Sequence, residues 1–304
     1  MNDGHVQVSV VPPEGRMRAL RVLFPASGID ERTELVAELL AASEHHGLAG
    51  LLEARRDGQL VGAVWAQTQP GLTAVLWPPG LAHGEGQATA RRLLTAACRH
   101  LAQQRIVIAQ SLLGHASEHQ AAGLQSVGFA PTAELIYLLA TESSFPGTPP
   151  ARDLEFESHC QANRARLAGI LLRTYEQSLD CPQLNGVRRV DDILAGYRAT
   201  GSFDPAHWLI VRRAGRDIGC LLLADQPRMG HVELMYMGVV PEARGSGCGL
   251  AMVRHAQWLA RTHGRARLML AVDARNRPAL AIYDAAGFVG WERRQVWTRT
   301  FAGS

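Results

Sequence analysis

The sequence predicts an α/β (α+β) protein made of two similar domains, each with a central mixed β-sheet flanked by helices. Three observations support this fold class. Runs of alternating apolar residues are followed by amphipathic stretches, which favours layers of strands and helices. The pattern repeats after about 160 residues, so a second copy follows the first. Each copy also places a glycine-rich turn between a strand and an amphipathic helix.

The individual elements follow from periodicity and turn residues. In the first copy we expect a helix at about 31–46 and strands at about 16–24, 50–57 and 60–68. In the second copy we expect strands at about 207–213 and 217–224. Asp57-Gly58 and Ala214-Gly215 are expected to form the hairpin turns. Prolines and glycines after residue 143 indicate a linker, so the expected domains are 1–143 and 153–304, joined by 144–152.

Composition excludes several classes of protein. Of 304 residues, 47% are apolar and 19% charged, which is typical of a packed globular chain. The net charge of +3 comes from mixed charges without long basic runs, so we expect no nucleic-acid partner. No stretch has the apolar length of a membrane span, and the opening residues lack a signal peptide, so a cytoplasmic protein without membrane contact is expected. Five widely spaced cysteines are expected to be free thiols, and no metal site is expected.

The most informative segment, residues 239–253, reads VVPEARGSGCGLAMV. A strand enters a turn that carries Gly245, Gly247 and Gly249, and an amphipathic helix follows. Glycines can adopt positive φ and have no Cβ to obstruct a ligand, so successive N–H groups can face one anion at the helix N-terminus. The segment therefore predicts a diphosphate-binding loop.

Two other glycine-rich loops fit less well. A Walker loop requires a lysine, and this chain contains none. A dinucleotide-binding fingerprint would need a glycine at Leu250 and an acidic residue about twenty positions later, where residues 263–267 offer none. The remaining pattern is Arg-x-x-Gly-x-Gly, formed by Arg244, Gly247 and Gly249.

This pattern resembles the pyrophosphate loop of the GNAT superfamily of acyl-CoA-dependent N-acyltransferases, Gln/Arg-x-x-Gly-x-Gly/Ala. A second family motif, Asn-x-x-Ala-x-x-x-Tyr-x-x-x-Gly-Phe, is matched by Asn276, Ala279, Tyr283, Gly287 and Phe288. The chain is therefore similar to two-domain members of this superfamily. The resemblance implies the family fold in each domain, acetyl-CoA as the donor and a primary amine of a small molecule as the acceptor.

The resemblance also implies residue roles. Glu233 would be the general base and Tyr283 the acid that protonates the departing thiolate, although a surface carboxylate and a packing ring are the alternatives. The implied CoA-binding residues are Met237, Gly238, Val239, Arg244, Gly245, Ser246, Gly247, Cys248, Gly249 and Asn276. Two of these have open alternatives, because Arg244 can pair with Glu242 and Asn276 can simply cap a helix. The family shapes its acceptor pocket with the segment after the first helix, here residues 176–206, so Tyr175, Asp180 and Arg188 are acceptor candidates.

The two copies differ in polar groups. The first copy has His83, Gly86 and Ala88 at the loop positions, with Leu124 in place of Tyr283 and Ser117 in place of Asn276. We expect it to perform no chemistry and either to complete the acceptor site or to brace the second copy, as a pseudo-dimer within a monomer. Whether the loop with Gly86 and Ala88 still admits CoA stays open. Two other functions stay open: a CoA-binding sensor without turnover, and a relative that takes its acyl group from aminoacyl-tRNA.

Overall fold

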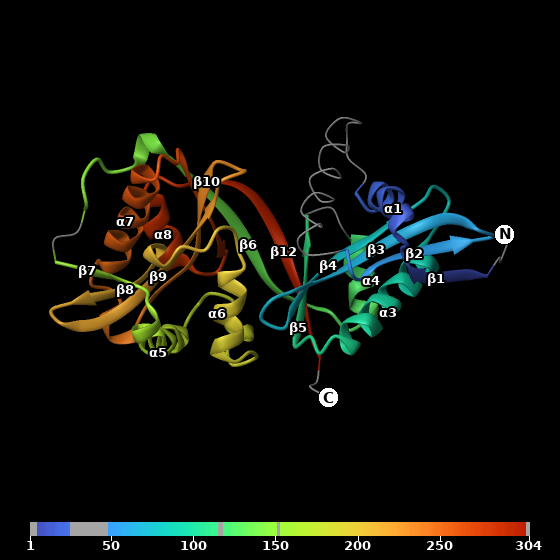
Figure 1. The fold of residues 1–304 in the computed structure, drawn as a ribbon, viewed down its shortest axis with the longest axis horizontal. Coiled ribbons are helices and arrows are strands. Elements are labelled where there is room, and N and C mark those ends of the chain that lie inside the picture. Colours follow the sequence, from blue (N-terminus) through green and yellow to red (C-terminus); the bar gives the residue numbers. More distant parts are fainter. Residues whose placement is uncertain (1–4, 25–47, 115–117, 151–152, 302–304) are drawn as a thin grey trace. The chain divides into compact units, whose positions relative to one another are not determined.

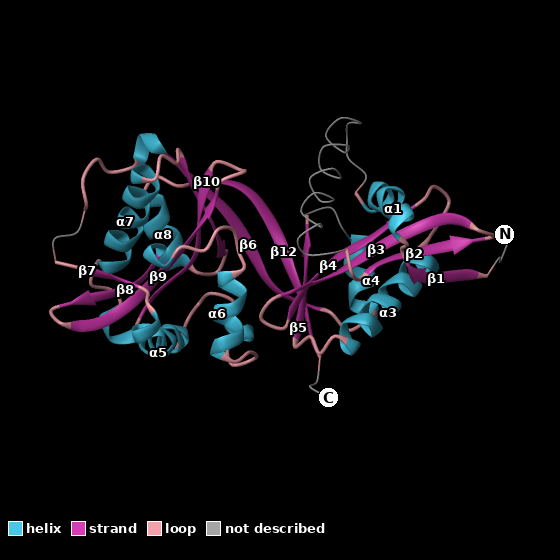
Figure 2. Ribbon diagram, viewed as in Figure 1, coloured by secondary structure: helices cyan, strands magenta, loops and turns pink. Residues whose placement is uncertain are grey.

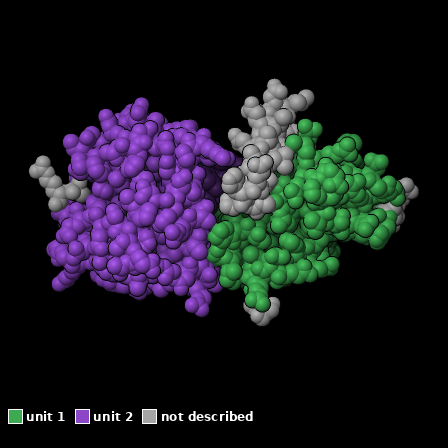
Figure 3. All heavy atoms as spheres, in the orientation of Figure 1, with its two compact units in different colours: residues 1–132, 295–304 green, residues 133–294 purple. Residues whose placement is uncertain are grey.

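The computed structural model describes residues 5–24, 48–114, 118–150 and 153–301. The helix expected at about 31–46 and the position of Ser117 lie outside these residues. Contacts divide the chain into unit 1, residues 1–132 with 295–304, and unit 2, residues 133–294 (Figure 3).

Unit 1 contains a mixed sheet with the strand order β1-β2-β3-β4-β5-β12 (Figure 1). Neighbouring strands are antiparallel except for β4 and β5, which are parallel. Helices α3 and α4 pack on one face and α1 packs on the other. Its elements are β1 (Val6–Val10), α1 (Arg16–Leu23), β2 (Leu51–Arg56), β3 (Gln59–Gln69), β4 (Thr73–Leu81), α3 (Gln87–Gln103), β5 (Ile108–Leu113) and α4 (Glu118–Ser126).

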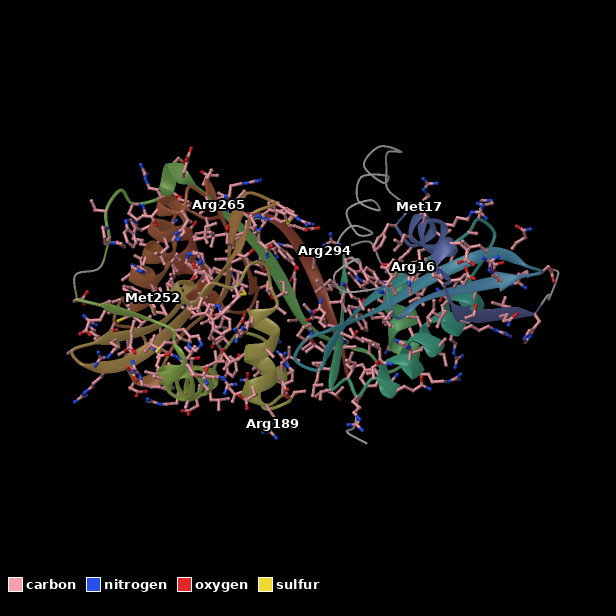
Figure 4. The ribbon with its side chains drawn as sticks, viewed as in Figure 1. Arg16, Met17, Arg189, Met252, Arg265 and Arg294 are labelled. Atoms are coloured by element: carbon pink, nitrogen blue, oxygen red, sulfur yellow. The ribbon has the colours of Figure 1, made fainter. Side chains whose placement is uncertain are left out.

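Unit 2 contains a mixed sheet with the strand order β6-β11-β10-β9-β8-β7 (Figure 2). Only β10 and β11 are parallel neighbours among the described pairs. Helices α7 and α8 cover one face, where Met252 of α7 is fully buried, and α5 and α6 cover the other (Figure 4 labels Met252). Its elements are β7 (Glu155–Ser158), α5 (Arg164–Tyr175), α6 (Val190–Arg198), β8 (Trp208–Arg213), β9 (Arg216–Gln226), β10 (His231–Val239), α7 (Cys248–Thr262), β11 (Arg267–Asp273) and α8 (Arg277–Ala285). Strands β6 (Ala130–Thr141) and β12 (Val289–Thr300) each have residues in both units.

The fold class predicted from the sequence is confirmed, since both copies order their described elements alike around a mixed sheet. Their last strands are exchanged. Residues 135–141 of β6, which end the first copy, pair with β11 of unit 2. Residues 295–300 of β12, which end the second copy, pair with β5 of unit 1. The sequence copies and the compact units are therefore different sets of residues.

One expected strand is wrong. Residues 16–24 form helix α1 at Arg16–Leu23, because Ala19, Leu20 and Leu23 share one buried side at helical spacing. A short turn at Pro13–Gly15 starts this helix, and the strand of this region is β1. Both hairpin turns are confirmed, with φ of 50° and 78° at Asp57 and Gly58 and 48° and 74° at Ala214 and Gly215. In the described part of the chain, none of the helices combines the length and hydropathy needed to cross a membrane.

Candidate active site

The candidate site of unit 2 lies where β10 and β11 part. Among the described residues these parallel strands share two residue pairs, Val232 with Leu268 and Glu233 with Met269. The register of β10 against β9 then shifts between Leu234 and Tyr236, which is a β-bulge. A cavity of about 210 Å³ opens beyond these pairs, lined by residues of both strands, of α8 and of the segment after α5. The two strands therefore separate just after the bulge.

The loop that follows β10 presents the N-terminus of helix α7. Gly245 and Gly247 have φ of +74° and +81°, a region that side-chain-bearing residues rarely adopt, and Gly247 is the N-cap of α7. Apart from each glycine and its two chain neighbours, no heavy atom of the described residues lies within 4 Å of the position where a Cβ would stand. The first N–H groups of α7 therefore carry partial positive charge at an open surface, which suits an anion.

The third glycine of the motif serves packing instead. A Cβ on Gly249 would lie 2.8 Å from Cδ1 of Ile282 on helix α8. Gly249 therefore packs against the end of the Ile282 side chain, which would have to shift to admit a Cβ. Gly238 of β10 is similar, since a Cβ there would lie 2.5 Å from Cβ of Thr174 and 2.7 Å from the hydroxyl of Tyr236. The close backbone approach at Gly238 is made by the protein's own helix α5.

Arg244 is committed to backbone carbonyls. Its guanidinium donates hydrogen bonds to the carbonyl oxygens of Val239 (3.0 Å), Gln177 (3.3 Å), Thr174 (3.0 Å) and Glu176 (2.8 Å). Three of these carbonyls are at the end of α5 or just beyond it, where helix carbonyls lack partners of their own. Glu242 forms its ion pair with Arg173, and the charge of Arg244 also lowers the pKa of Glu242. Arg244 joins the end of α5 to the end of β10.

We therefore expect Arg244→Lys to lower the free energy of unfolding of unit 2 by about 1.5–3 kcal/mol, because one ammonium cannot span four carbonyls. Urea denaturation followed by tryptophan fluorescence would measure the change. The matched control is Arg189→Lys, at the exposed N-cap of α6 (Figure 4). Equal stability of the two variants would contradict the linking role of Arg244.

Tyr283 and Asn276 both line the cavity from helix α8. The Tyr283 side chain is buried and its ring packs against Phe288, with ring centroids 5.5 Å apart. Burial raises the pKa of Tyr283 well above its ordinary value, so its phenol is protonated at neutral pH. Asn276 caps α8, because its Oδ1 accepts a hydrogen bond from the N–H of Ala279 at 3.3 Å. The helix-cap interpretation of Asn276 is confirmed, and its side chain still borders the cavity.

Glu233 lies beside the cavity and is not among its lining residues. It precedes the bulge of β10, and its carboxylate accepts a hydrogen bond from Nε2 of Gln226 at 3.0 Å. The negative charge of Glu233 contributes to raising the pKa of Tyr137 on β6. Tyr137 is the strand partner of Ala271 on β11, and Ala271 is an exposed residue of the cavity lining. Tyr137 was not among the sequence candidates, because it belongs to the first copy and reaches this sheet only through the exchanged strand.

The three acceptor candidates come from the segment around the end of α5. Asp180 lines the cavity, burial raises the pKa of its carboxyl, and one of its oxygens accepts a hydrogen bond from the N–H of Asp273 at 3.1 Å. Tyr175 lies outside the cavity lining, with its hydroxyl 3.5 Å from that of Tyr197, and burial raises its pKa to about 12. The positive charge of Arg188 acts on both tyrosines and slightly opposes this rise in pKa. Only Asp180 of the three faces the cavity.

The remaining CoA candidates follow from their positions. Met237 and Val239 line the cavity with Gly238. Ser246 donates to the carbonyl of Ala243 at 2.6 Å, and the thiol of buried Cys248 lies 3.4 Å from Nη1 of Arg213. Both side chains are thus engaged within the protein, which leaves their backbone N–H groups for a ligand. Within the described ranges, no cluster of three or more His, Cys, Asp or Glu side chains suits a metal ion.

Residues 172–288 match the model of the Acetyltransferase (GNAT) family. A protein of Paenarthrobacter aurescens named mycothiol acetyltransferase is 31% identical over 220 residues, which cover 68% of this chain and 64% of that protein. A second one, from Pseudarthrobacter chlorophenolicus, is 34% identical over 36% of this chain and 35% of its own length. The matches thus span less than two thirds of these relatives.

Two solved structures share the fold. A GCN5-related N-acetyltransferase from Sphaerobacter thermophilus has a TM-score of 0.67 at 17% identity, with 97% of this chain and 95% of that chain covered. A tandem GNAT protein from the clavulanic acid biosynthesis pathway has a TM-score of 0.55 at 13% identity, with 97% and 98% covered. At these identities the likeness concerns the fold.

Proposed function

We propose that this chain is a tandem acetyltransferase of the GNAT type, in which unit 2 transfers the acetyl group of acetyl-CoA to a primary amine of a small molecule. The observation that carries the proposal is the cavity between strands β10 and β11, at the point where the two strands separate. Helix α7 follows β10 in the chain, and its N-terminus is open. A channel beside an anion-binding helix start suits a donor with a diphosphate at one end and a thioester at the other.

CoA supplies the acetyl group as a thioester, and this chain's backbone provides its binding groups. We propose that the N–H groups of residues 245–249 bind the diphosphate, since Gly245 and Gly247 keep that surface open. The segment Met237–Val239, which follows the bulge, would donate N–H groups to the pantetheine amides and to the thioester carbonyl. Such donors stabilise the oxygen as it gains negative charge during acyl transfer.

Two proton transfers accompany the reaction. The amine forms a bond to the acetyl carbon and gives up a proton, the C–S bond breaks, and the thiolate takes a proton. We propose that Glu233 accepts the amine proton through water, because it directly precedes Leu234 of the cavity lining and is not itself a lining residue. We propose that Tyr283 protonates the sulfur, since burial keeps its phenol protonated inside the cavity. Asp180, whose pKa burial raises, would hold the acceptor amine.

The acceptor is proposed to be a small molecule. The curated relatives named mycothiol acetyltransferase support a small-molecule acceptor over a tRNA-linked one. The five cysteines, none of them paired, suit a reducing compartment, so we also propose a cytoplasmic location.

The proposal is tested by incubating the purified protein with acetyl-CoA and a panel of primary amines. We expect free CoA to be released in step with an acetylated product whose mass is 42 Da above that of the amine, the general mass of an added acetyl group. A sensor would bind CoA without release by any amine. A tRNA-dependent relative would ignore acetyl-CoA and bind nucleic acid in a salt-dependent way.

A further inference from the structure

The first copy carries an acidic residue inside its own version of the loop. Helix α3 begins after His83-Gly84-Glu85-Gly86, and α7 begins after Arg244-Gly245-Ser246-Gly247. Counted from the two helix N-caps, Gly86 and Gly247, Glu85 stands where unit 2 has Ser246. In unit 2 this loop is the proposed diphosphate site.

Glu85 is firmly held at the start of α3. Its two carboxylate oxygens accept hydrogen bonds from Nε and Nη2 of Arg56, each at 3.1 Å, and one also accepts from the hydroxyl of Thr89 at 2.5 Å. Thr89 is a buried residue of the first turn of α3. The hydrogen bonds from Arg56 and Thr89 lower the pKa of Glu85, so the carboxylate is ionised at neutral pH.

The backbone of the two loops also differs. Gly247 has a φ of +81°, whereas Gly86 is extended with a φ of −133°. The carboxylate of Glu85 already lies beside the first turn of α3, where it accepts a hydrogen bond from Thr89. The N-terminus of a helix is the end at which negative charge is stabilised. Both loops have open space at their glycines, so the difference that a diphosphate would meet in unit 1 is the carboxylate of Glu85 beside the start of α3.

We propose that Glu85 takes the place of the ligand phosphate in unit 1, so that the chain binds one CoA, through unit 2, instead of two. This inference rests on the proposed function, because it assumes that CoA is the ligand of the loop in unit 2. It assigns Glu85, with Arg56 and Thr89, as the group that makes the two homologous loops differ in specificity.

Isothermal titration calorimetry with CoA tests the proposal in the full chain. We expect the wild type to bind one CoA per chain. Gly247→Val places a Cβ at an open, positive-φ position of the loop in unit 2, and we expect this variant to bind none. Gly264→Val is the matched control, because Gly264 also has positive φ and open space but follows the far end of α7. Both changes carry similar backbone strain, so a loss of binding that is confined to Gly247→Val cannot come from strain alone. Gly264→Val should bind one CoA with an affinity within about threefold of the wild type, because Gly264 lies away from the loop.

A gain of binding tests the role of Glu85 itself. In the Gly247→Val background we expect Glu85→Ser, which introduces the residue that unit 2 has at this position, to restore binding of one CoA. Glu14→Ser removes an exposed negative charge elsewhere in unit 1 and should restore none. Circular dichroism of each variant shows whether the units remain folded.

The outcomes separate the two proposals. Two CoA molecules on the wild type would overturn the inference about Glu85 and leave the proposed site of unit 2 intact. One CoA retained by folded Gly247→Val would overturn both the inference and the assignment of the bound CoA to the loop of unit 2. A folded double variant that binds no CoA would overturn Glu85 as the excluding group. No CoA on the wild type would instead overturn the proposed function.

Discussion

Glu233→Gln is expected to lower kcat by about 10²- to 10⁴-fold, because a general base contributes by that factor to a reaction in which an amine must lose a proton. The amide keeps the size of the side chain and its hydrogen-bond acceptor for Gln226. The affinity for CoA should stay within about twofold, since the carboxylate acts in the transition state and not on the bound donor. Steady-state kinetics and CoA titration measure the two quantities separately.

Asp180→Asn is the variant that decides between the two carboxylates. Asp180 lines the cavity, and burial raises the pKa of its carboxyl, so it too can accept a proton. If Asp180 only holds the acceptor, its loss should raise KM for the amine about tenfold or more and leave kcat within a few-fold. A fall in kcat with Asp180→Asn, together with a wild-type kcat for Glu233→Gln, would move the general base to Asp180.

Tyr283→Phe is expected to lower kcat by about 10²-fold, because the thiolate then leaves without a positioned proton donor. The phenylalanine ring retains the packing against Phe288, so the melting temperature should change little. The raised pKa of Tyr283 implies that its phenol stays protonated up to alkaline pH. Ionisation of this group should therefore not limit the wild-type rate near neutral pH.

Phe288→Leu is the control for the alternative role of Tyr283. It removes the aromatic partner of Tyr283 and keeps the hydroxyl. A packing role for Tyr283 would make both variants lose stability and rate to a similar degree. An acid role would confine the large loss of kcat to Tyr283→Phe, while Phe288→Leu mainly lowers the melting temperature.

The sequence was sufficient for features that depend on the local backbone. Positive φ at Gly245 and Gly247, the hairpins at Asp57-Gly58 and Ala214-Gly215, and the cap at Asn276 each involve residues a few positions apart. The spacing of glycine, asparagine and tyrosine therefore indicated the loop, the start of α8 and the ring that lines the cavity. The two-copy fold was likewise visible, since a repeated order of strands and helices can be read along one chain.

The sequence pattern gave the wrong element where the two-residue period of a strand and the 3.6-residue period of a helix fit the same residues. Residues 16–24 mix arginines with apolar residues closely enough to suggest alternation, yet Ala19, Leu20 and Leu23 form the buried side of helix α1. The choice between strand and helix was made by packing against the sheet of unit 1, which stabilises the helical arrangement of those three side chains.

Side-chain partners across long sequence separations came only from the tertiary structure. Arg244 matches the family loop in sequence, but its hydrogen bonds go to carbonyls at the end of α5, about 70 positions earlier. Gly249 and Gly238 look like ligand-facing glycines, yet Ile282 and Thr174 occupy the space that a Cβ would need. The partner of Glu85, Arg56, is 29 positions away in sequence.

The exchange of the last strands was decided in the same way. Strands β6 and β12 both end a copy, and the hydrogen bonds that a strand edge offers are nearly the same in either sheet, so alternation of residues cannot say which edge each one joins. Turns, helix caps and positive φ depend on residues that are neighbours along the chain, so they can be predicted from the sequence. Which edge, helix end or carboxylate a residue meets across the fold depends on contacts that form only when the whole chain has packed.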